Sequence, residues 1–233
     1  MSATQAHSTP PGPDGRRRAG RPARVLELMI VFGVAPALLA LGPRWLVSIA
    51  ILLAGASCAA MLARDSSFPR RALLDVSAAR PGLGEVLRRT AAVWLGLLVI
   101  TAIASPRSLF SFPRARPAVW LLVMCLYPLS AYAQELTFRT FFFHRYRELF
   151  TSPRARVLAS GLIFGWAHVA VNNLLALPLA AVAGVLFART YERSRSTVLV
   201  SLEHALYGDF VFSVGLGGLF YSASRWVATA ASR

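Results

Sequence analysis

The sequence predicts an all-α fold, a polytopic transmembrane bundle of about seven or eight spans. Two observations carry this prediction. Hydrophobic residues make up 56% of the 233 residues and charged residues only 15%, a composition that does not fit a soluble surface. The chain also contains several apolar runs near the ~20 residues that a spanning helix needs, separated by short breaks rich in arginine and proline.

The formal net charge of +15 raises the question of nucleic acid binding. The arginines, however, lie at the ends of the apolar runs and do not gather on one surface. That distribution is typical of the cytoplasmic flanks of membrane helices. We therefore expect an integral membrane protein with a cytoplasmic N-terminus and the lipid bilayer as its surroundings, and no nucleic acid partner.

The first 24 residues are rich in proline, glycine, serine and arginine and predict a disordered basic arm. The run that follows, from Val25 to Leu41, is long for a signal peptide and contains Pro36. A second apolar run comes almost immediately after it. We therefore expect a retained first helix in place of a cleaved leader.

The expected spans follow the apolar runs in order. They cover about 26–42, 45–62, 91–105, 118–143, 157–172, 174–189 and 197 onward. The segment 64–90 alternates leucine and valine with arginine, which favours a surface-lying segment at the bilayer interface. Glycines at 215, 217 and 218 can break the last run, so the count stays at seven or eight. Residues 25–114 thus form N-terminal transmembrane helices with an interfacial loop, and 115–225 a second membrane region.

Ionisable side chains inside spans are costly and indicate a functional site. They are Glu27, Glu135, Arg139, His168, Glu203, His204 and Asp209. The four-residue spacing of Glu135 and Arg139 places both on one helix face. This pair is either a structural ion pair or part of a site in which the carboxylate acts as a general base.

The two histidines extend the candidate site. His168 has Asn172 one helical turn later, and His204 lies between two acids, Glu203 and Asp209. Depths counted from the helix ends allow Glu135, His168 and His204 to converge in one half of the bilayer. Such a group can polarise a water, with or without a metal ion. The His-Glu-x-x-His spacing of soluble zinc proteases is absent.

Three short motifs occur in order on separate apolar runs: Glu135-x-x-x-Arg139, Phe164-x-x-x-His168, and His204 before the end of the last run. Together they resemble the CPBP family over roughly residues 115–220. That family includes type II CAAX prenyl endopeptidases and Abi-like bacterial relatives linked to bacteriocin processing or self-immunity. The resemblance implies an intramembrane metalloprotease fold for residues 115–225.

The resemblance implies a catalytic role for Glu135, Arg139, His168 and His204, and a supporting role for Gln134, Asn172, Glu203 and Asp209. The family pattern has Glu-Glu where this chain has Gln134-Glu135, and asparagine where it has Gly208. An amide is not a useful base, so Glu135 is expected to take that role, and Asp209 or Asn172 to supply the polar group missing at Gly208. The Gln-Glu pair is interpreted as a feature of a bacterial subfamily in the inner membrane.

The predicted function is endoproteolysis of a C-terminal or membrane-embedded segment by a water that Glu and His activate, with a membrane-anchored or C-terminally tagged protein as substrate. The cofactor stays unknown; a divalent metal such as zinc is one candidate, with Glu135, His168 and His204 as ligands. Two alternatives stay open. One is a non-catalytic family member acting as a binding or immunity scaffold, which Gln134 favours. The other is a small transporter, although no inverted repeat is evident.

Overall fold

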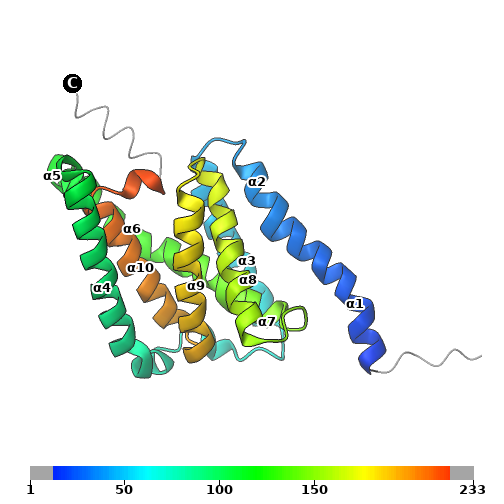
Figure 1. Cartoon of the computed structure of the whole chain (residues 1–233). Coiled ribbons are helices and arrows are strands. Elements are labelled where there is room, and N and C mark those ends of the chain that lie inside the picture. The colour runs from blue at the N-terminus through cyan, green and yellow to red at the C-terminus, as the bar shows by residue number, and fades with distance from the viewer. Residues whose placement is uncertain (1–12, 221–233) are drawn as a thin grey trace, which may run out of the picture.

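The computed structural model of the chain is a bundle of helices, and it describes residues 13–220 (Figure 1). No strand occurs in this part of the chain, so the predicted fold class is confirmed. The longer helices are α1 Pro13–Leu28, α3 Trp45–Arg64, α4 Arg80–Ala104, α6 Pro117–Glu135, α8 Pro153–Ala167, α9 Ala176–Ser194 and α10 Thr197–Ser213. Helix α10 packs against α4, α6 and α9.

The first apolar run is one continuous helical rod with a π-helical turn in its middle. After α1 come η1 Met29–Val34 and α2 Ala35–Leu39. Helix α1 begins at Pro13, inside the segment predicted to be disordered, because arginine and alanine also favour helix. Residues 1–12 of that predicted arm lie outside the described part.

Helix α1 leans away from the bundle in Figure 1, and an ion-pair cluster fastens it to the short helix α7 Phe142–Arg145. Arg145 donates from Nε and Nη2 to the two carboxylate oxygens of Glu27, at 3.0 and 2.6 Å. The hydroxyl of Tyr146 donates to the same carboxylate at 2.9 Å. Nothing in the sequence pairs Glu27 with these residues, which lie more than a hundred positions further along the chain.

The predicted surface segment 64–90 differs from the structure in its second half. Two short turns, η2 Arg70–Leu73 and η3 Ser77–Ala79, are followed by α4, which starts at Arg80 and continues unbroken into the predicted third span. The arginines near its start do not interrupt the helix, because arginine has a high helix propensity. In the loop, Asp65 is 2.8 Å from Nε2 of His144, and this contact holds the pKa of Asp65 below its usual range.

The predicted fourth span is a single rod from Pro117 to Arg145. It consists of α6, the π-helical η5 Leu136–Phe141 and α7. A π-helical turn inside a helix often accompanies a functional site, because it rotates side chains out of the regular α-helical register. Here it covers Arg139 and follows directly after Glu135.

Helices α8 and α9 approach each other closely through small residues. A Cβ atom added at Gly165 would lie 2.6 Å from Cβ of Ala181 and 2.9 Å from the Leu177 carbonyl oxygen. The spacing Gly161-x-x-x-Gly165 on α8 faces Gly184 on α9, where an added Cβ would be 3.0 Å from the Gly161 oxygen. Small residues at this spacing allow membrane helices to pack backbone against backbone.

The last helix ends where the glycines predict a break. Helix α10 stops at Ser213, and Gly215 follows with a φ of +92° before the short turn η7 Gly217–Leu219. The end of the predicted region 115–225, after residue 220, lies outside the described residues. The predicted 174–189 span corresponds to α9 and is joined to α10 by a tight turn at Arg195, where φ is +52°.

Four helical segments of the described chain are long and apolar enough to cross a membrane: Gly20–Leu39, Trp45–Arg64, Ser77–Ala104 and Pro117–Arg145. Helices α8, α9 and α10 are shorter or more polar and pack among them. Outward faces carry large apolar side chains, such as Leu122, Leu126 and Leu129 on α6, each more than half exposed. Such a surface needs lipid, so the protein is an integral membrane protein.

Replacing Gly165 with alanine tests the α8–α9 contact. We expect the Gly165→Ala protein to lose about 1–3 kcal/mol of unfolding free energy, because the new methyl group must push α9 away. The matched control is Gly96→Ala on α4, where an added Cβ meets nothing within 4 Å. That variant is expected to keep or slightly gain stability, since alanine favours helix over glycine. Unfolding in detergent measures both, and equal stability of the two variants would contradict the packing.

Candidate active site

The site is built around the buried ion pair that the Glu-x-x-x-Arg spacing predicts. Nη1 of Arg139 donates to Oε1 of Glu135 at 3.0 Å, and both side chains are fully buried. Two buried charges are tolerated only when they are paired and hydrogen-bonded. The surroundings of Arg139 therefore decide whether this arrangement is stable.

Arg139 is enclosed by α8 and α9. Its Nη2 donates to the carbonyl oxygen of Gly184 at 3.1 Å. The guanidinium carbon lies 4.4 Å from the ring centre of Phe164 and 5.4 Å from that of Phe187. Aromatic faces attract a desolvated cation, so these rings stabilise the charge that the bilayer interior would otherwise destabilise.

His204 on α10 meets the same carboxylate. Its Nδ1 is 2.7 Å from Oε1 of Glu135, and its ring stacks on Phe187 with centroids 4.8 Å apart. Its other nitrogen, Nε2, is 3.0 Å from the hydroxyl of Tyr127 on α6. The predicted convergence of Glu135 and His204 is therefore present, and both nitrogens of the imidazole are engaged.

His168 lies near this network without a direct hydrogen bond to it. It follows the last residue of α8, and its Nδ1 donates to the Phe164 carbonyl oxygen at 2.8 Å. The Phe164 ring stands between the two histidines, 4.8 Å from the His168 ring and 5.5 Å from the His204 ring. Because Nδ1 carries the donated proton, Nε2 of His168 keeps a free lone pair.

An apolar cavity of about 370 Å³ lies on one side of the network. The turn η1 and helices α2 and α3 form one side of it, and the ends of α6 and α8 with the turns η5 and η6 form the other. Its polar lining residues are Gln134, Thr137 and His168; Glu135 and His204 do not line it. Gln134 donates from Nε2 to the hydroxyl of Ser130 at 3.2 Å. The predicted site is thus divided into a cavity-facing pair, Gln134 and His168, and a buried network behind it.

Asn172 does not join His168 on one helix face as the helical spacing predicts. Helix α8 ends at Ala167, and after the turn η6 His168–Val171 the backbone of Asn172 is left-handed, with a φ of 54°. Its side-chain amide donates to the Ala40 carbonyl oxygen at 2.9 Å. Asn172 therefore connects α8 to α2 and lies outside the site.

The two acids that flank His204 in the sequence also lie outside the network. Adjacent residues on a helix point about 100° apart, so Glu203 points towards α4 and α9. There it accepts from Nε of Arg89 at 2.8 Å and from the hydroxyl of Thr190 at 2.6 Å. Asp209 is partly buried, and its Oδ1 has no hydrogen-bond partner within the described chain.

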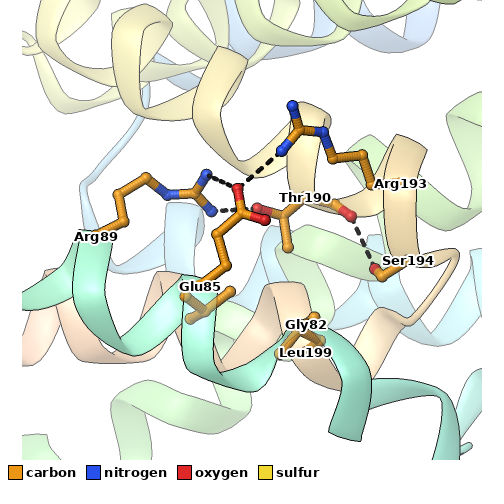
Figure 2. Close-up of a pocket in the computed structure, with 8 residues that line it drawn as sticks. Gly82, Glu85, Arg89, Thr190, Arg193, Ser194 and Leu199 are labelled. Atoms are coloured by element: carbon orange, nitrogen blue, oxygen red, sulfur yellow. Dashed lines mark hydrogen bonds and ion pairs between the residues drawn. The ribbon is translucent and has the colours of Figure 1, made fainter.

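Figure 2 shows the ion pairs that surround this Arg89 contact. Glu85 and Arg89 come from α4, while Thr190, Arg193 and Ser194 come from α9. Arg193 donates to Glu85 at 2.8 Å, and Ser194 donates to the Thr190 carbonyl oxygen at 2.8 Å. These residues line a small pocket of about 30 Å³. With Glu203, this network joins α4, α9 and α10, so the role of Glu203 is helix packing.

Four contact residues of the site were not singled out by sequence reasoning. They are Tyr127, Phe164 as an aromatic partner of Arg139, Gly184 and Phe187. Tyr127 had a sequence signal, because it lies about two helical turns before Glu135 on the same rod. Gly184 and Phe187 had none, since their role depends on how closely α9 packs.

The predicted metal ligands do not fit a metal site in this arrangement. One oxygen of Glu135 already accepts from Arg139 and His204, and both nitrogens of His204 have partners. Among the described residues, no group of three or more His, Cys, Asp or Glu side chains is placed to hold a metal ion. We therefore derive no catalytic step through a metal.

Fold and site together define a polytopic helical membrane protein with a buried Glu–Arg–His network beside an apolar cavity. Residues 116–208 match the family model described as type II CAAX prenyl endopeptidase Rce1-like. This segment holds every residue of the network, and its match to the family model agrees with the resemblance that the motifs indicate. No curated protein and no solved structure matches the chain.

The buried pair can be tested by a double-mutant cycle. We expect Arg139→Met to lower the unfolding free energy by about 3–5 kcal/mol, because it leaves Glu135 charged and buried without its cation. Adding Glu135→Gln should recover part of that loss. Arg193→Met, at the exposed pair with Glu85, is the matched control and should cost less than about 1 kcal/mol. Equal losses at Arg139 and Arg193 would contradict the buried pair.

Proposed function

We propose that the protein is an intramembrane endopeptidase that hydrolyses a peptide bond in a C-terminal or membrane-embedded segment of another protein. One observation supports this proposal most strongly: His168 lines an apolar cavity, and the Phe164 ring connects it to the buried network. Both the histidine and the network lie in the segment that matches the family model. A cavity of this size can hold an apolar peptide segment while its few polar groups orient the reacting bond.

His168 is the best placed group to activate water. Its Nδ1 is fixed by the Phe164 carbonyl oxygen, so Nε2 can accept a proton from a water in the cavity. The water oxygen then bonds to the peptide carbonyl carbon. As the carbon–nitrogen bond breaks, the imidazolium returns the proton to the leaving amine. Atoms and charges balance without a further reactant.

Glu135 has a different role in this proposal from that of the base, which the sequence predicts for it in place of Gln134. Its Oε1 accepts two hydrogen bonds, and the side chain is fully buried behind the cavity. It is suited to hold His204 and Arg139 in place. Water would have to reach its other oxygen, Oε2, for Glu135 itself to act as the base.

Gln134 faces the cavity where the resemblance implies a glutamate. An amide cannot accept a proton near neutral pH, but it can donate to a substrate carbonyl and accept from a substrate N–H. Gln134 is thus suited to orient the peptide and to stabilise the developing oxyanion.

The substrate side of the proposal follows from the walls of the cavity. They are almost wholly apolar and belong to helices with lipid-facing surfaces, which supports a membrane-anchored or C-terminally tagged protein as substrate.

The arginine-flanked helix ends support a cytoplasmic N-terminus, and the Gln-Glu pair supports a bacterial inner-membrane subfamily. A divalent metal is not needed for the steps described.

A second function, a binding or immunity scaffold, is favoured by the same Gln134. A cavity that binds an apolar peptide but lacks a carboxylate can retain a partner without cleaving it. Restoring the carboxylate separates the two functions, because a silenced protease should regain cleavage.

The test is cleavage of a C-terminally anchored reporter in cells that carry each variant. We expect wild-type cleavage and a fall of about 10²–10⁴-fold for His168→Gln, which removes the base. His144→Gln is the matched control, because that histidine pairs with Asp65 away from the cavity. If the Gln134→Glu protein cleaves the reporter and the wild-type protein does not, the result would contradict the protease proposal and favour the scaffold.

A further inference from the structure

The contact between Tyr127 and His204 has no role in the steps above. The hydroxyl of Tyr127 is 3.0 Å from Nε2 of His204, and the two rings meet edge to face with centroids 5.8 Å apart. Nδ1 of His204 is held by Glu135 at 2.7 Å. Both contacts come from helix α6, so one helix fixes the imidazole of another at both of its nitrogens.

Gly208 is what allows this contact. It lies one turn after His204 on α10, and a Cβ atom there would overlap Cε1, Cζ and the hydroxyl oxygen of Tyr127. Any residue larger than glycine would therefore displace the phenol ring. Gly208 is also the position where the resemblance implies an asparagine. The chain thus lacks the polar side chain at 208 and has a polar group from the facing helix in the space that it would occupy.

The two residues that the sequence suggests as replacements for the missing polar group, Asn172 and Asp209, make no side-chain hydrogen bond to His204. Asn172 donates to the Ala40 carbonyl oxygen, on the side of α2. Asp209 makes no side-chain hydrogen bond to His204. Tyr127 is the residue whose polar atom reaches Nε2 of the imidazole.

The proton positions follow from charge balance. Glu135 pairs with Arg139, so as a carboxylate it only accepts hydrogen bonds, and Nδ1 of His204 must carry a proton. Glu135 and Arg139 already cancel, and a protonated His204 would leave a net charge in a site closed to solvent. His204 is then neutral, with a lone pair on Nε2 that accepts the Tyr127 hydroxyl proton.

We propose that Tyr127 is the positioning residue of His204, that it fixes the imidazole in its Nδ1-protonated form, and that Gly208 is kept small to admit it. This role contributes to catalysis only if the proposed endopeptidase function is correct, so the inference rests on that function. The state of the His204 ring can nevertheless be measured whether or not the protein cleaves a substrate.

The experiment is ¹⁵N NMR of histidine-labelled protein in lipid nanodiscs. The chain has only four histidines, and a His204→Gln variant assigns the resonances of His204. We expect wild-type His204 to show a protonated Nδ1 and a hydrogen-bonded, unprotonated Nε2. In Tyr127→Phe the Nε2 resonance should move towards that of a free imine nitrogen, because the hydroxyl that donates to it is gone. The matched control is Tyr132→Phe on the same helix, whose hydroxyl donates to the Leu73 carbonyl oxygen.

A compensating pair of substitutions makes the test independent of simple loss of structure. Gly208→Asn alone should disrupt the site by overlapping the phenol, and Tyr127→Ala alone should leave Nε2 without a partner. The double variant Tyr127→Ala with Gly208→Asn should recover the bonded Nε2 resonance. An unchanged Nε2 resonance in Tyr127→Phe would overturn the inference. If the wild type cleaves nothing, the proposed function is wrong, while the resonance still decides whether Tyr127 positions His204.

Discussion

The ion pair between Glu135 and Arg139 is the interaction on which the other parts of the structure depend. Both side chains are fully buried, and removing such charges from water costs several kcal/mol for each ion. The pair is stable only because three other helices complete it. Helix α9 supplies the Gly184 carbonyl and the Phe187 ring, α8 supplies the Phe164 ring, and α10 supplies His204. The glycines between α8 and α9 are thus a condition for the site, since a wider spacing would remove partners from Arg139.

This dependence gives each motif residue a physical role. Phe164 provides the face of its ring to Arg139, which requires an aromatic residue, and its backbone carbonyl oxygen to His168, which depends only on the four-residue spacing. The π-helical turn after Glu135 places Arg139 in the same buried layer. The result is a rigid, neutral network on one side and an apolar cavity on the other. Rigid support behind a reactive side chain is the arrangement that preorganised catalysis requires.

Local patterns in the sequence were sufficient for some of these features. The all-helical membrane fold, most of the spans and the Glu135–Arg139 pair depend on hydropathy and on spacing within one helix. Contacts between distant helices were not predictable in the same way. The partners of Glu27, the turn of Glu203 towards Arg89 and the use of Asn172 against Ala40 are all settled by packing. Helix geometry separates Gln134 from Glu135 by about 100°, but only the packing of the neighbouring helices decides that Gln134 faces the cavity and Glu135 is buried.

The most direct test of the central claim uses purified protein in nanodiscs with an anchored peptide substrate in ¹⁸O-labelled water. Mass spectrometry then reads whether the new carboxyl terminus contains the label. The account predicts one labelled oxygen in the product of the wild-type protein, formed at a rate proportional to the amount of protein. Retention of an intact, bound peptide, with no labelled product at any protein concentration, would contradict it.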